Sequence, residues 1–352
     1  MKKKSAYAGA GVDIELGNRV KETLPELLAS TKRNEVLGQV GGFGGLFALN
    51  QRKYEQPILV SSVDGVGTKL KIAFLTNRHD TIGQDLVNHC VNDIAVLGAE
   101  PLFFLDYLGT GTLKPHVFSE IVRGFAVGCR DNGCALIGGE TAQMPGFYQK
   151  GEYDVSGTIV GVVDKERMLN GQKSIRNGDV IIGLASSGLH TNGYSLARKI
   201  LFDKMGLSVK RKVKELGCSV GDELLKVHVS YWPLLQSLLK KFNRPGKTAV
   251  IKGLAHITGG GFIDNIPRVL PPKSNAMIER GTWPVLPIFE LLQREGRVDE
   301  EEMFQAFNMG IGMIAVVSAG EADAVLRSLR ARSKEAWKIG SIRKGAGKTV
   351  LR

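Results

Sequence analysis

Apolar and polar positions along the first half of the chain predict strands and helices in alternation. Residues 57–63 are a short apolar run that ends at Asp64, which is typical of a buried strand that delivers a carboxylate to a loop. Residues 80–98 carry apolar side chains at helical spacing, with Asp80 or Thr81 as the N-terminal cap and Gly98 at the end. The same patterns predict strands at residues 102–105, 135–137 and 153–163 and a helix at residues 118–131.

A polar stretch between residues 164 and 179 separates this series from a second one. Because it contains the turn signals Asn170-Gly171 and Asn177-Gly178, we predict two domains, residues 1–168 and 169–352. The second series predicts strands at 180–185 and 311–317 and a helix at about 194–205, while residues 204–221 carry no clear pattern. The predicted fold class is α/β (α+β), with a mixed sheet in the N-terminal domain and an α/β sandwich in the C-terminal domain.

Glycine is the main compositional excess, at 44 of 352 residues, well above the roughly 7% of ordinary proteins. The glycines gather in short clusters beside Asp, Asn, Glu, Thr and Ser. Such clusters occur where the backbone must approach a ligand closely or adopt positive φ, so they are candidate binding loops.

The net charge of +12 is compatible with nucleic acid, a membrane surface or an anionic small molecule as partner. Basic residues concentrate only at residues 2–4 and 210–214, without an aromatic RNA-binding run or a Cys/His zinc spacing. No apolar run is long enough to span a membrane. We therefore expect neither a nucleic-acid nor a membrane partner. The four cysteines form no CxxC pair, which is typical of core thiols in the reducing cytoplasm.

Three acidic positions share one setting. Asp64 and Glu140 each follow an apolar strand, in the motifs Asp64-Gly-Val-Gly-Thr-Lys69 and Gly138-Gly-Glu-Thr141. Backbone N–H groups of such loops bind phosphate oxygens, Lys neutralises them, and carboxylates bind Mg²⁺. Asp93 shares the polar face of helix 80–98, where its apolar neighbours favour a metal ligand over a solvated side chain; that face consists of Asp85, His89, Asn92 and Asp93. We predict that Asp64, Asp93 and Glu140 converge on one oxygen-rich site.

Two loops of the C-terminal half have the composition of anion sites. Ser186-Ser-Gly-Leu-His-Thr-Asn-Gly193 leads from a strand into a helix, where hydroxyls and free N–H groups favour a sugar phosphate. Ala255-His-Ile-Thr-Gly-Gly-Gly261 contains three consecutive glycines, whose entropic cost argues against a passive connector. His256 in this loop is as compatible with a structural role as with a catalytic one. Gly345-Ala-Gly-Lys-Thr349 only mimics a Walker A loop, because position 342 is Ile and no helix can follow.

Taken in order, these motifs resemble those of the phosphoribosylformylglycinamidine cyclo-ligases, also called aminoimidazole ribonucleotide synthetases. The resemblance runs nearly end to end and also includes Tyr7-Ala-Gly-Ala-Gly-Val-Asp-Ile14, Cys90-Val-Asn-Asp93, Met144-Pro-Gly146 and Asn265-Ile-Pro-Arg268. It implies a cytoplasmic homodimer whose N-terminal domain binds ATP and dimerises and whose C-terminal domain binds substrate. The implied reaction of purine biosynthesis converts formylglycinamidine ribonucleotide and ATP into 5-aminoimidazole ribonucleotide, ADP and phosphate, with ATP and Mg²⁺ as cofactors.

The resemblance also implies roles for individual positions. The implied catalytic residues are Lys69, which would neutralise the phosphates, His190 and His256. The implied ATP-binding residues are Gly42, Gly44, Asp64, Gly65, Gly67, Thr68, Lys69, Asp93, Gly138, Gly139, Glu140 and Thr141. Of these, Asp64, Asp93 and Glu140 would also bind Mg²⁺. The implied substrate-binding residues are Ser187, Gly188, His190, Asn192, Thr258, Gly259 and Gly260.

The chain departs from the family pattern at three places. Thr112 stands where Lys is expected, and Leu97 stands where Gln is usual. Lys226-Val-His-Val-Ser-Tyr231 replaces a Pro-Thr-Arg-x-Tyr run, so that Arg is absent at Val229. Two alternatives remain open: a selenophosphate-synthetase-like relative, which would need a reactive Cys before Cys90, and a basic binding protein without enzymatic activity.

Overall fold

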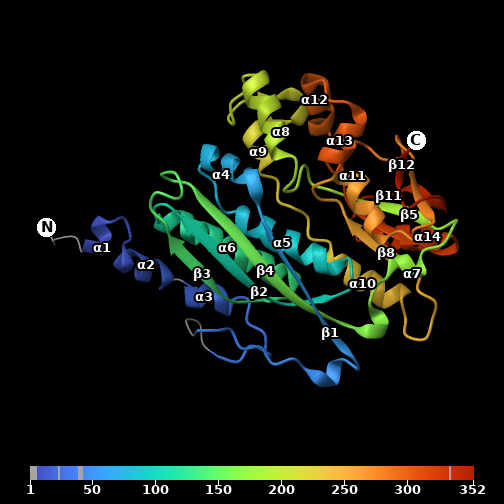
Figure 1. Ribbon diagram of the computed structural model, residues 1–352, viewed down its shortest axis with the longest axis horizontal. Coiled ribbons are helices and arrows are strands. Elements are labelled where there is room, and N and C mark those ends of the chain that lie inside the picture. Colours follow the sequence, from blue (N-terminus) through green and yellow to red (C-terminus); the bar gives the residue numbers. More distant parts are fainter. Residues whose placement is uncertain (1–5, 23, 39–42, 333) are drawn as a thin grey trace.

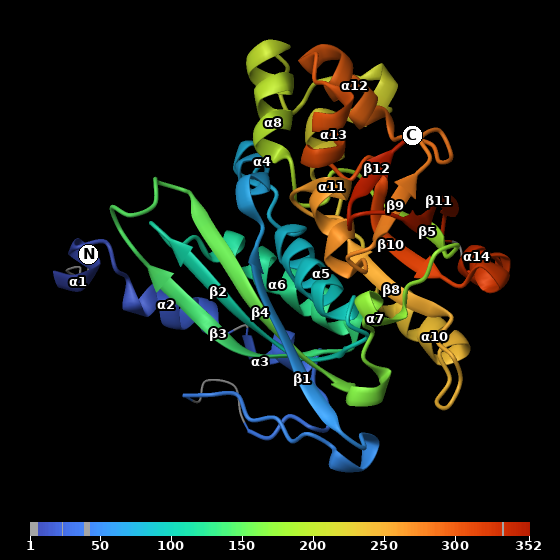
Figure 2. The same cartoon turned by 45° about the vertical axis from the view of Figure 1, so that its right-hand side comes forward.

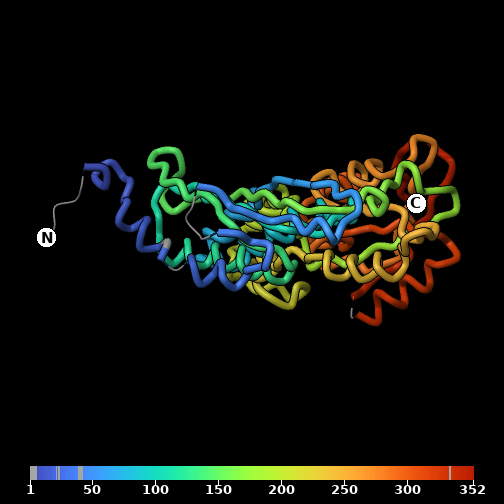
Figure 3. The backbone as a smooth tube through the Cα atoms, turned by 90° about the horizontal axis from the view of Figure 1, so that it is seen from below, coloured from blue at the N-terminus to red at the C-terminus, as the bar shows by residue number. Residues whose placement is uncertain are grey.

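The computed structural model of the protein describes residues 6–22, 24–38, 43–332 and 334–352. It contains two large β-sheets with their helices, arranged as two α/β units along the long axis of the molecule (Figure 1). Figure 3 shows the N-terminal helices at one end of this axis and the C-terminal unit at the other. The predicted α/β class with two domains is confirmed. Among the described residues, no helix is both long and apolar enough to cross a membrane.

The N-terminal unit is built on a four-stranded mixed sheet in the order β1-β4-β2-β3. Its strands are β1 (Pro57–Gly65), β2 (Glu100–Thr110), β3 (Ala135–Gln143) and β4 (Tyr153–Asp164). β2 and β3 pair in parallel, whereas β4 runs antiparallel to both β1 and β2. All four strands were predicted, and each extends beyond the short apolar run that indicated it. β1 and β3 are the two edges of the sheet.

Two long helices, α5 (Ile82–Ala95) and α6 (Pro115–Asn132), cover one face of this sheet (Figure 2). The apolar stripe of α5 is fully buried, as its periodicity predicted. The helices approach closely because Gly83 and Gly124 face each other: a Cβ on Gly83 would lie 2.3 Å from the backbone of α6. Thr81 precedes α5, but within the described part of the chain its side chain makes no capping hydrogen bond. Gly98 has a positive φ of 79°, consistent with its predicted place at the end of the helix.

No helix covers the opposite face of the sheet among the described residues (Figure 2). Leu59 and Val63 on β1 remain 63% and 64% exposed on it. The described part of the loop before β1 covers this face where the Phe47 ring packs against Phe103, at a centroid distance of 5.3 Å. Short elements flank the sheet: α1 (Ala6–Gly9), α2 (Ile14–Lys21), α3 (Leu24–Ala29), the 3₁₀ turn Gln51–Lys53 and α4 (Leu70–Thr76).

The C-terminal unit is built on a six-stranded sheet in the order β12-β9-β11-β5-β10-β8. Its strands are β5 (Val180–Ala185), β8 (Ile251–His256), β9 (Ser274–Ile278), β10 (Ile311–Val317), β11 (Ala336–Lys344) and β12 (Thr349–Leu351). β10 is buried along its whole length, which explains why it reads as a continuous apolar run. The strands predicted at 180–185 and 311–317 are confirmed.

In this unit, α8 (Tyr194–Arg198) continues as a π-helical segment, Lys199–Lys204. Together they confirm the helix predicted at about 194–205. The segment without a clear pattern folds as the small ribbon β6 (Lys212–Val213) and β7 (Cys218–Ser219), followed by α9 (Val220–Leu224). The remaining helices are α7 (Gly171–Ser174), α10 (Trp232–Phe242), α11 (Gly261–Asn265), α12 (Pro287–Gly296), α13 (Glu300–Ala306) and α14 (Ala322–Arg330).

Residues 226–231, which we call the docking segment, join the C-terminal unit to the polar face of α5. Asp85 accepts from the His228 N–H at 2.8 Å, and Asn88 donates to the His228 carbonyl at 2.8 Å. Asn92 donates to the Val229 carbonyl at 2.8 Å and accepts from the Tyr231 backbone N–H at 2.9 Å. These spacings along α5 bring three polar side chains to one side of the helix. Asp85 and Asn92 are therefore interdomain contacts, neither solvated nor free for a metal.

Candidate active site

Two of the three predicted acids meet where β1 and α5 adjoin. Asp64, near the end of β1, accepts a hydrogen bond from His89 Nε2 at 2.8 Å. Asp93 on α5 lies 3.9 Å from the same nitrogen and accepts from His256 Nδ1 at 2.8 Å and from the Ser62 hydroxyl at 3.2 Å. Asp64 and Asp93 thus share one site, to which the C-terminal unit contributes His256.

The electrostatics of this site keep both acids ionised. Burial alone would raise the pKa of Asp64 and of Asp93, but hydrogen bonds and charge from the neighbouring imidazoles outweigh it and lower both pKa values. For His89, burial acts to lower the pKa, yet the hydrogen bond to Asp64 and the charges of both acids raise it overall. The imidazole of His89 therefore lies between two carboxylates whose charge favours its protonated form.

The donor set of the acid pair fits a divalent cation such as Mg²⁺. The Asp64 and Asp93 side chains are 40% and 29% exposed, so carboxylate oxygens remain accessible to a ligand. Mg²⁺ is usually held in proteins by one or two carboxylates together with substrate phosphates and water. Substrate phosphates and water can therefore supply the remaining ligands.

Glu140, the third predicted metal ligand, does not join this pair within the chain. It lies on β3, at the opposite edge of the sheet from β1. The register pairs Tyr107 with Glu140 and Asp106 with Gly139, so the glutamate belongs to the row of the uncovered face. Asp64 points to the other face, where α5 lies. The prediction that all three acids converge is wrong for a single copy of the chain, because strand order cannot be read from motif spacing.

Lys69, predicted to neutralise phosphates, is wholly buried at the interface of the two units. Its ammonium pairs with Asp85 at 2.8 Å and donates to the carbonyls of His190 and Lys226 at 3.2 and 2.7 Å. All three of its hydrogen-bonding positions are occupied. This arrangement contradicts a phosphate contact and makes Lys69 an interdomain clamp instead. A lysine close to glycines in the sequence is only a weak indication of a phosphate site, because the sequence does not show whether the lysine is buried.

His190, predicted to contact the substrate, is almost wholly buried in the single chain. It is 1% exposed, and its Nε2 accepts from the backbone N–H groups of Ser187 at 3.2 Å and Val229 at 3.4 Å. Its φ of 60° places it in the left-handed region, which a non-glycine residue adopts at a cost. His190 therefore fixes the loop after β5 against the docking segment.

The other predicted substrate-binding residues come together from two loops. A Cβ on Gly259 would lie 3.3 Å from Asn192 Oδ1, so the loop after β5 touches the loop after β8. Among the described residues, the buried Asn192 Nδ2 has no hydrogen-bond partner, so this donor is available to a ligand. Thr258 is held by Asn265, and Gly260 has a φ of 89°. Two further members have internal contacts: Ser187 donates to the Val227 carbonyl, and the Gly188 carbonyl accepts from Ser186 and Asn308.

The predicted ATP-binding loops are only partly placed. Gly42 lies outside the described residues, and Gly44 is exposed. Gly67 has a φ of 63°, and the following Thr68 hydroxyl lies 3.1 Å from the Ser195 hydroxyl of α8, so this loop reaches the C-terminal unit. Gly65 ends β1, where its backbone N–H donates to Asp64.

The Gly138-Gly-Glu-Thr141 motif lies on β3, away from the acid pair. Gly139 is required because a Cβ there would lie 2.4 Å from the backbone carbonyl oxygen of Asp106. Thr141 lines a hollow of about 150 Å³ between α2 and β3. These residues, including Gly138, remain predicted ATP contacts for which the chain alone offers no common site with Asp64.

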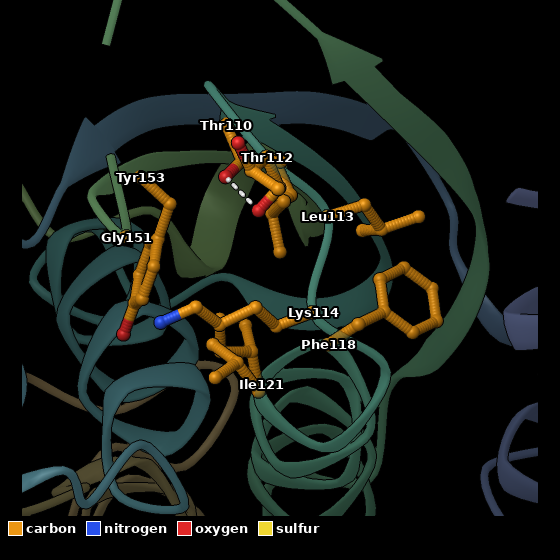
Figure 4. A pocket seen from close by; sticks show the side chains of 10 residues that line it. Thr110, Thr112, Leu113, Lys114, Phe118, Ile121, Gly151 and Tyr153 are labelled. Atoms are coloured by element: carbon orange, nitrogen blue, oxygen red, sulfur yellow. Dashed lines mark hydrogen bonds between the residues drawn. The ribbon is translucent and has the colours of Figure 1, made fainter. Parts of the chain in front are cut away.

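A smaller hollow of about 10 Å³ lies under the end of β2 (Figure 4). It is lined by Thr112, the position where the family pattern leads us to expect Lys. Figure 4 shows the Lys114 side chain running along the hollow toward Tyr153. A lysine amine is therefore present two residues after the expected position, in a space with room for about one water molecule.

Sequence reasoning missed His228, the central residue of the docking segment. Its Nε2 lies 3.0 Å from His256 Nε2, and its ring stacks on His190 at a centroid distance of 4.0 Å. The signal was available, because the segment departs from the family pattern and carries a lone His between two valines. Ser62, which donates to Asp93, was also missed, since a serine inside a strand has no distinctive pattern.

Three buried imidazoles, His190, His228 and His256, have ring nitrogens within 4.8 Å of one another, as in a metal site. However, the rings of His190 and His228 are stacked at 4.0 Å with an inclination of only 21°, so their in-plane lone pairs lie in two nearly parallel planes and do not meet at one ion. His190 Nε2 is moreover already an acceptor of two backbone N–H groups. We therefore interpret this group as a hydrogen-bonded imidazole cluster.

Comparisons with solved structures agree with the fold. A thiamine-monophosphate kinase from Stenotrophomonas maltophilia matches with a TM-score of 0.69 at 17% identity, over 93% of this chain and 94% of that one. The hydrogenase maturation protein HypE in complex with ATP matches with a TM-score of 0.64 at 18% identity, over 95% of this chain and 90% of that one. At such identities the likeness shows the fold alone.

Comparisons of sequence show the family. The AIR synthase related protein N-terminal domain family matches residues 50–163, and its C-terminal domain family matches residues 176–351. Phosphoribosylformylglycinamidine cyclo-ligase of Syntrophotalea carbinolica is 53% identical over 98% of this chain and 96% of that protein. The enzyme of the same name from Geobacillus thermodenitrificans is 53% identical over 97% and 96%. The chain therefore belongs to the phosphoribosylformylglycinamidine cyclo-ligases, the ligases that close the imidazole ring in purine biosynthesis.

Proposed function

We propose that this chain closes the ring of formylglycinamidine ribonucleotide with ATP and Mg²⁺, releasing 5-aminoimidazole ribonucleotide, ADP and phosphate. One observation carries the site assignment: Asp93, which shares His89 with Asp64, pairs with His256 of the C-terminal unit where the glycine loop begins. In this proposal, the acid pair binds the cation on one side of His256, and the glycine loop after β8 binds an anion on the other.

The chemistry is activation of a poor leaving group. The formyl oxygen of the substrate attacks the γ-phosphorus of ATP, and ADP leaves. The amidine nitrogen then attacks the phosphorylated carbon, the C–O bond breaks, phosphate leaves, and the nitrogen loses a proton. A magnesium ion, when bound, neutralises phosphate charge. Such reactions depend mainly on positioning and on charge stabilisation, which preorganised side chains supply.

The chain's residues divide this work between the two units. Asp64 and Asp93 would hold the cation and, through it, the triphosphate. Asn192, with its unsatisfied buried Nδ2, would donate to the substrate phosphate beside Gly259. His256 lies between the acid pair and that loop, where the formyl group and the γ-phosphate must meet. The rigid contacts of Asp93 with His256 and Ser62 support such an arrangement because preorganised groups need not reorient during reaction.

We further propose that the chain acts as a homodimer that associates through the uncovered face of the N-terminal sheet. An exposed apolar patch on a sheet face is typical of an interface. Leu59 and Val63 lie on this face and are exposed in the single chain. Glu140 belongs to the same face. Because Asp64 points to the covered face, Glu140 of a second copy would reach the acid pair around the edge strand β1. We also expect a cytoplasmic enzyme, in keeping with four free cysteines.

The function is tested by incubating the purified protein with formylglycinamidine ribonucleotide, ATP and Mg²⁺. We expect formation of the aminoimidazole product with release of one ADP and one phosphate for each ring closed. Omission of Mg²⁺ should abolish product. ATP hydrolysis without the aminoimidazole, or selenide-dependent phosphate release, would instead support the selenophosphate-synthetase-like alternative.

A further inference from the structure

Four buried imidazoles meet where the two units join, although they come from four separate parts of the chain. They are His89 on α5, His190 after β5, His228 in the docking segment and His256 at the end of β8. Each is at most 6% exposed. Buried imidazoles need hydrogen-bond partners, so their contacts define which ring nitrogen carries a proton.

The imidazoles form a continuous series of contacts that begins and ends at the acid pair. His256 Nδ1 lies 2.8 Å from Asp93, and His256 Nε2 lies 3.0 Å from His228 Nε2. His228 Nδ1 lies 3.3 Å from the Thr191 hydroxyl, which lies 2.7 Å from His89 Nδ1. His89 Nε2 then returns to the second acid of the pair at 2.8 Å.

One assignment of protons satisfies every member of this series. The carboxylate of Asp93 can only accept, so His256 Nδ1 carries a proton, and in a neutral imidazole Nε2 is then an acceptor. His228 Nε2 must then donate to His256, and its Nδ1 must accept from the Thr191 hydroxyl. The Thr191 oxygen in turn accepts from His89 Nδ1. The amide of Asn92, whose Nδ2 lies 3.2 Å from His228 Nε2, directs a hydrogen to the Val229 carbonyl instead.

The His228 ring has no freedom to turn away from this arrangement. Its backbone N–H and carbonyl are held by Asp85 and Asn88 of α5, each at 2.8 Å. One face of the ring stacks on His190, which is itself fixed by two backbone N–H groups. Residues locked in this way position the groups that they contact.

We propose that His228 is a positioning residue: it holds His256 with Nδ1 toward Asp93 and ties it, through Thr191, to His89. This inference rests on the proposed function, in which His256 faces the reacting groups. His228 itself would touch neither ATP nor substrate. It would act by keeping one tautomer and one orientation of His256, so its loss should lower kcat rather than raise KM.

The test compares His228→Leu, which removes both ring nitrogens at similar volume, with His228→Gln, whose side-chain amide can still donate to His256. We expect kcat of His228→Leu to fall about 10- to 100-fold, as for partners that orient a functional histidine, with KM values within about threefold. His228→Gln should recover most of that loss. His116→Leu, at an exposed position on α6, serves as the matched control and should keep wild-type kcat.

A second readout does not depend on turnover. ¹⁵N-edited NMR of the histidine side chains, assigned with a His256→Gln variant, should show His256 as the Nδ1–H tautomer in the wild type and a mixture of tautomers in His228→Leu. An Nε2–H tautomer in the wild type, unchanged kcat in His228→Leu, or a lower kcat with an unchanged tautomer would overturn the proposal. If the wild type makes no aminoimidazole, the proposed function fails, and the tautomer still tests the positioning.

Discussion

At the scale of single residues, burial separates side chains that join the two units from side chains that remain open to a ligand. Lys69 and Asp85 form a fully buried ion pair, and His190 is almost as inaccessible. Asp64 and Asp93 keep exposed carboxylate oxygens although each contacts an imidazole. We therefore expect the acid pair to contact the ligands and the buried lysine to hold the two units together.

Asp93 is the residue whose loss should affect turnover most selectively. Asp93→Asn keeps the size of the side chain but removes the charge that pairs with His256 and would hold the cation. We expect turnover to fall by about two orders of magnitude or more, with the far-ultraviolet circular dichroism spectrum unchanged. Asp131→Asn, at an exposed position on α6, is the control and should be fully active. Activity of Asp93→Asn within a few-fold of wild type would remove Asp93 from the cation site.

Lys69 should matter for stability more than for ATP binding. Lys69→Met leaves the Asp85 carboxylate buried without its counter-ion, so the free energy of unfolding in urea should fall by about 3–5 kcal/mol. Adding Asp85→Asn removes the buried charge while the amide oxygen can still accept from the His228 N–H, and should recover part of the loss. Lys71→Met is the control, since its partner Glu152 is accessible to water. Unchanged stability with a raised KM for ATP would restore the phosphate role.

Asp106, in the centre of β2, should make stability depend on pH. Burial and the nearby charge of Glu140 raise its pKa from 3.8 to about 7. Between those values the folded protein retains a proton that the unfolded chain has released, so stability falls as pH rises through this window, by up to about 1.4 kcal/mol per pH unit. Asp106→Asn should remove this pH dependence. The urea midpoint of the variant should therefore rise relative to that of wild type between pH 5 and pH 8. An equal pH dependence in both proteins would show that the carboxyl is ionised at low pH.

At the scale of elements, the sequence predicted those parts whose pattern is local. The stripe of α5 and the apolar run of β10 are set by burial of one face or of a whole strand, so periodicity alone found them. The docking segment was not predicted, because its conformation depends on side chains of α5 more than 130 residues away. For the same reason, the sequence did not indicate His228. Nor did it show that Asp85, on the polar face of the predicted helix, contacts the other unit.

The packing of α5 on α6 offers a test of how closely the site depends on its supporting helix. A Cβ at Gly83 would lie 2.3 Å from the Ile121 carbonyl and the Phe125 N–H, and backbone cannot yield cheaply. Gly83→Ala should therefore lower the free energy of unfolding by about 1–3 kcal/mol and, by shifting α5, reduce turnover. Gly320→Ala, where no atom lies within 4 Å of the added Cβ, should stay within about 0.5 kcal/mol of wild type. A neutral Gly83→Ala would mean that the helices separate without cost.

At the scale of the whole molecule, the position of Glu140 is the main difference between sequence and structure. Motif spacing predicted that Asp64 and Glu140 each follow a strand, whereas both lie within strands, and it cannot report that these strands, β1 and β3, occupy opposite edges. The sequence resemblance nevertheless identified the family, which sequence comparison over nearly the whole chain confirms. A homodimer built on the uncovered sheet face would reconcile the two, because it supplies a second Glu140.

The proposed homodimer leads to a prediction about association. Leu59→Lys together with Val63→Lys places two charges on the uncovered face, where burial of an unpaired ammonium is costly. Size-exclusion chromatography with light scattering should show a dimer for wild type and a monomer for this variant at micromolar concentration. Leu75→Lys is the control, since Leu75 is 57% exposed on α4, away from that face. A double variant that remains dimeric would place the interface elsewhere.

Mixed dimers decide whether Glu140 acts across such an interface. If each site takes Asp64 from one copy and Glu140 from the other, a heterodimer of Asp64→Asn and Glu140→Gln chains contains one doubly altered site and one intact site. Both variants should be inactive alone, and their mixture should regain about half of the wild-type activity per heterodimer. If both residues serve a site within one copy, every site in the mixture carries one substitution and no activity returns. Complementation would thus connect an exposed glutamate, an uncovered sheet face and the acid pair in a single assembly.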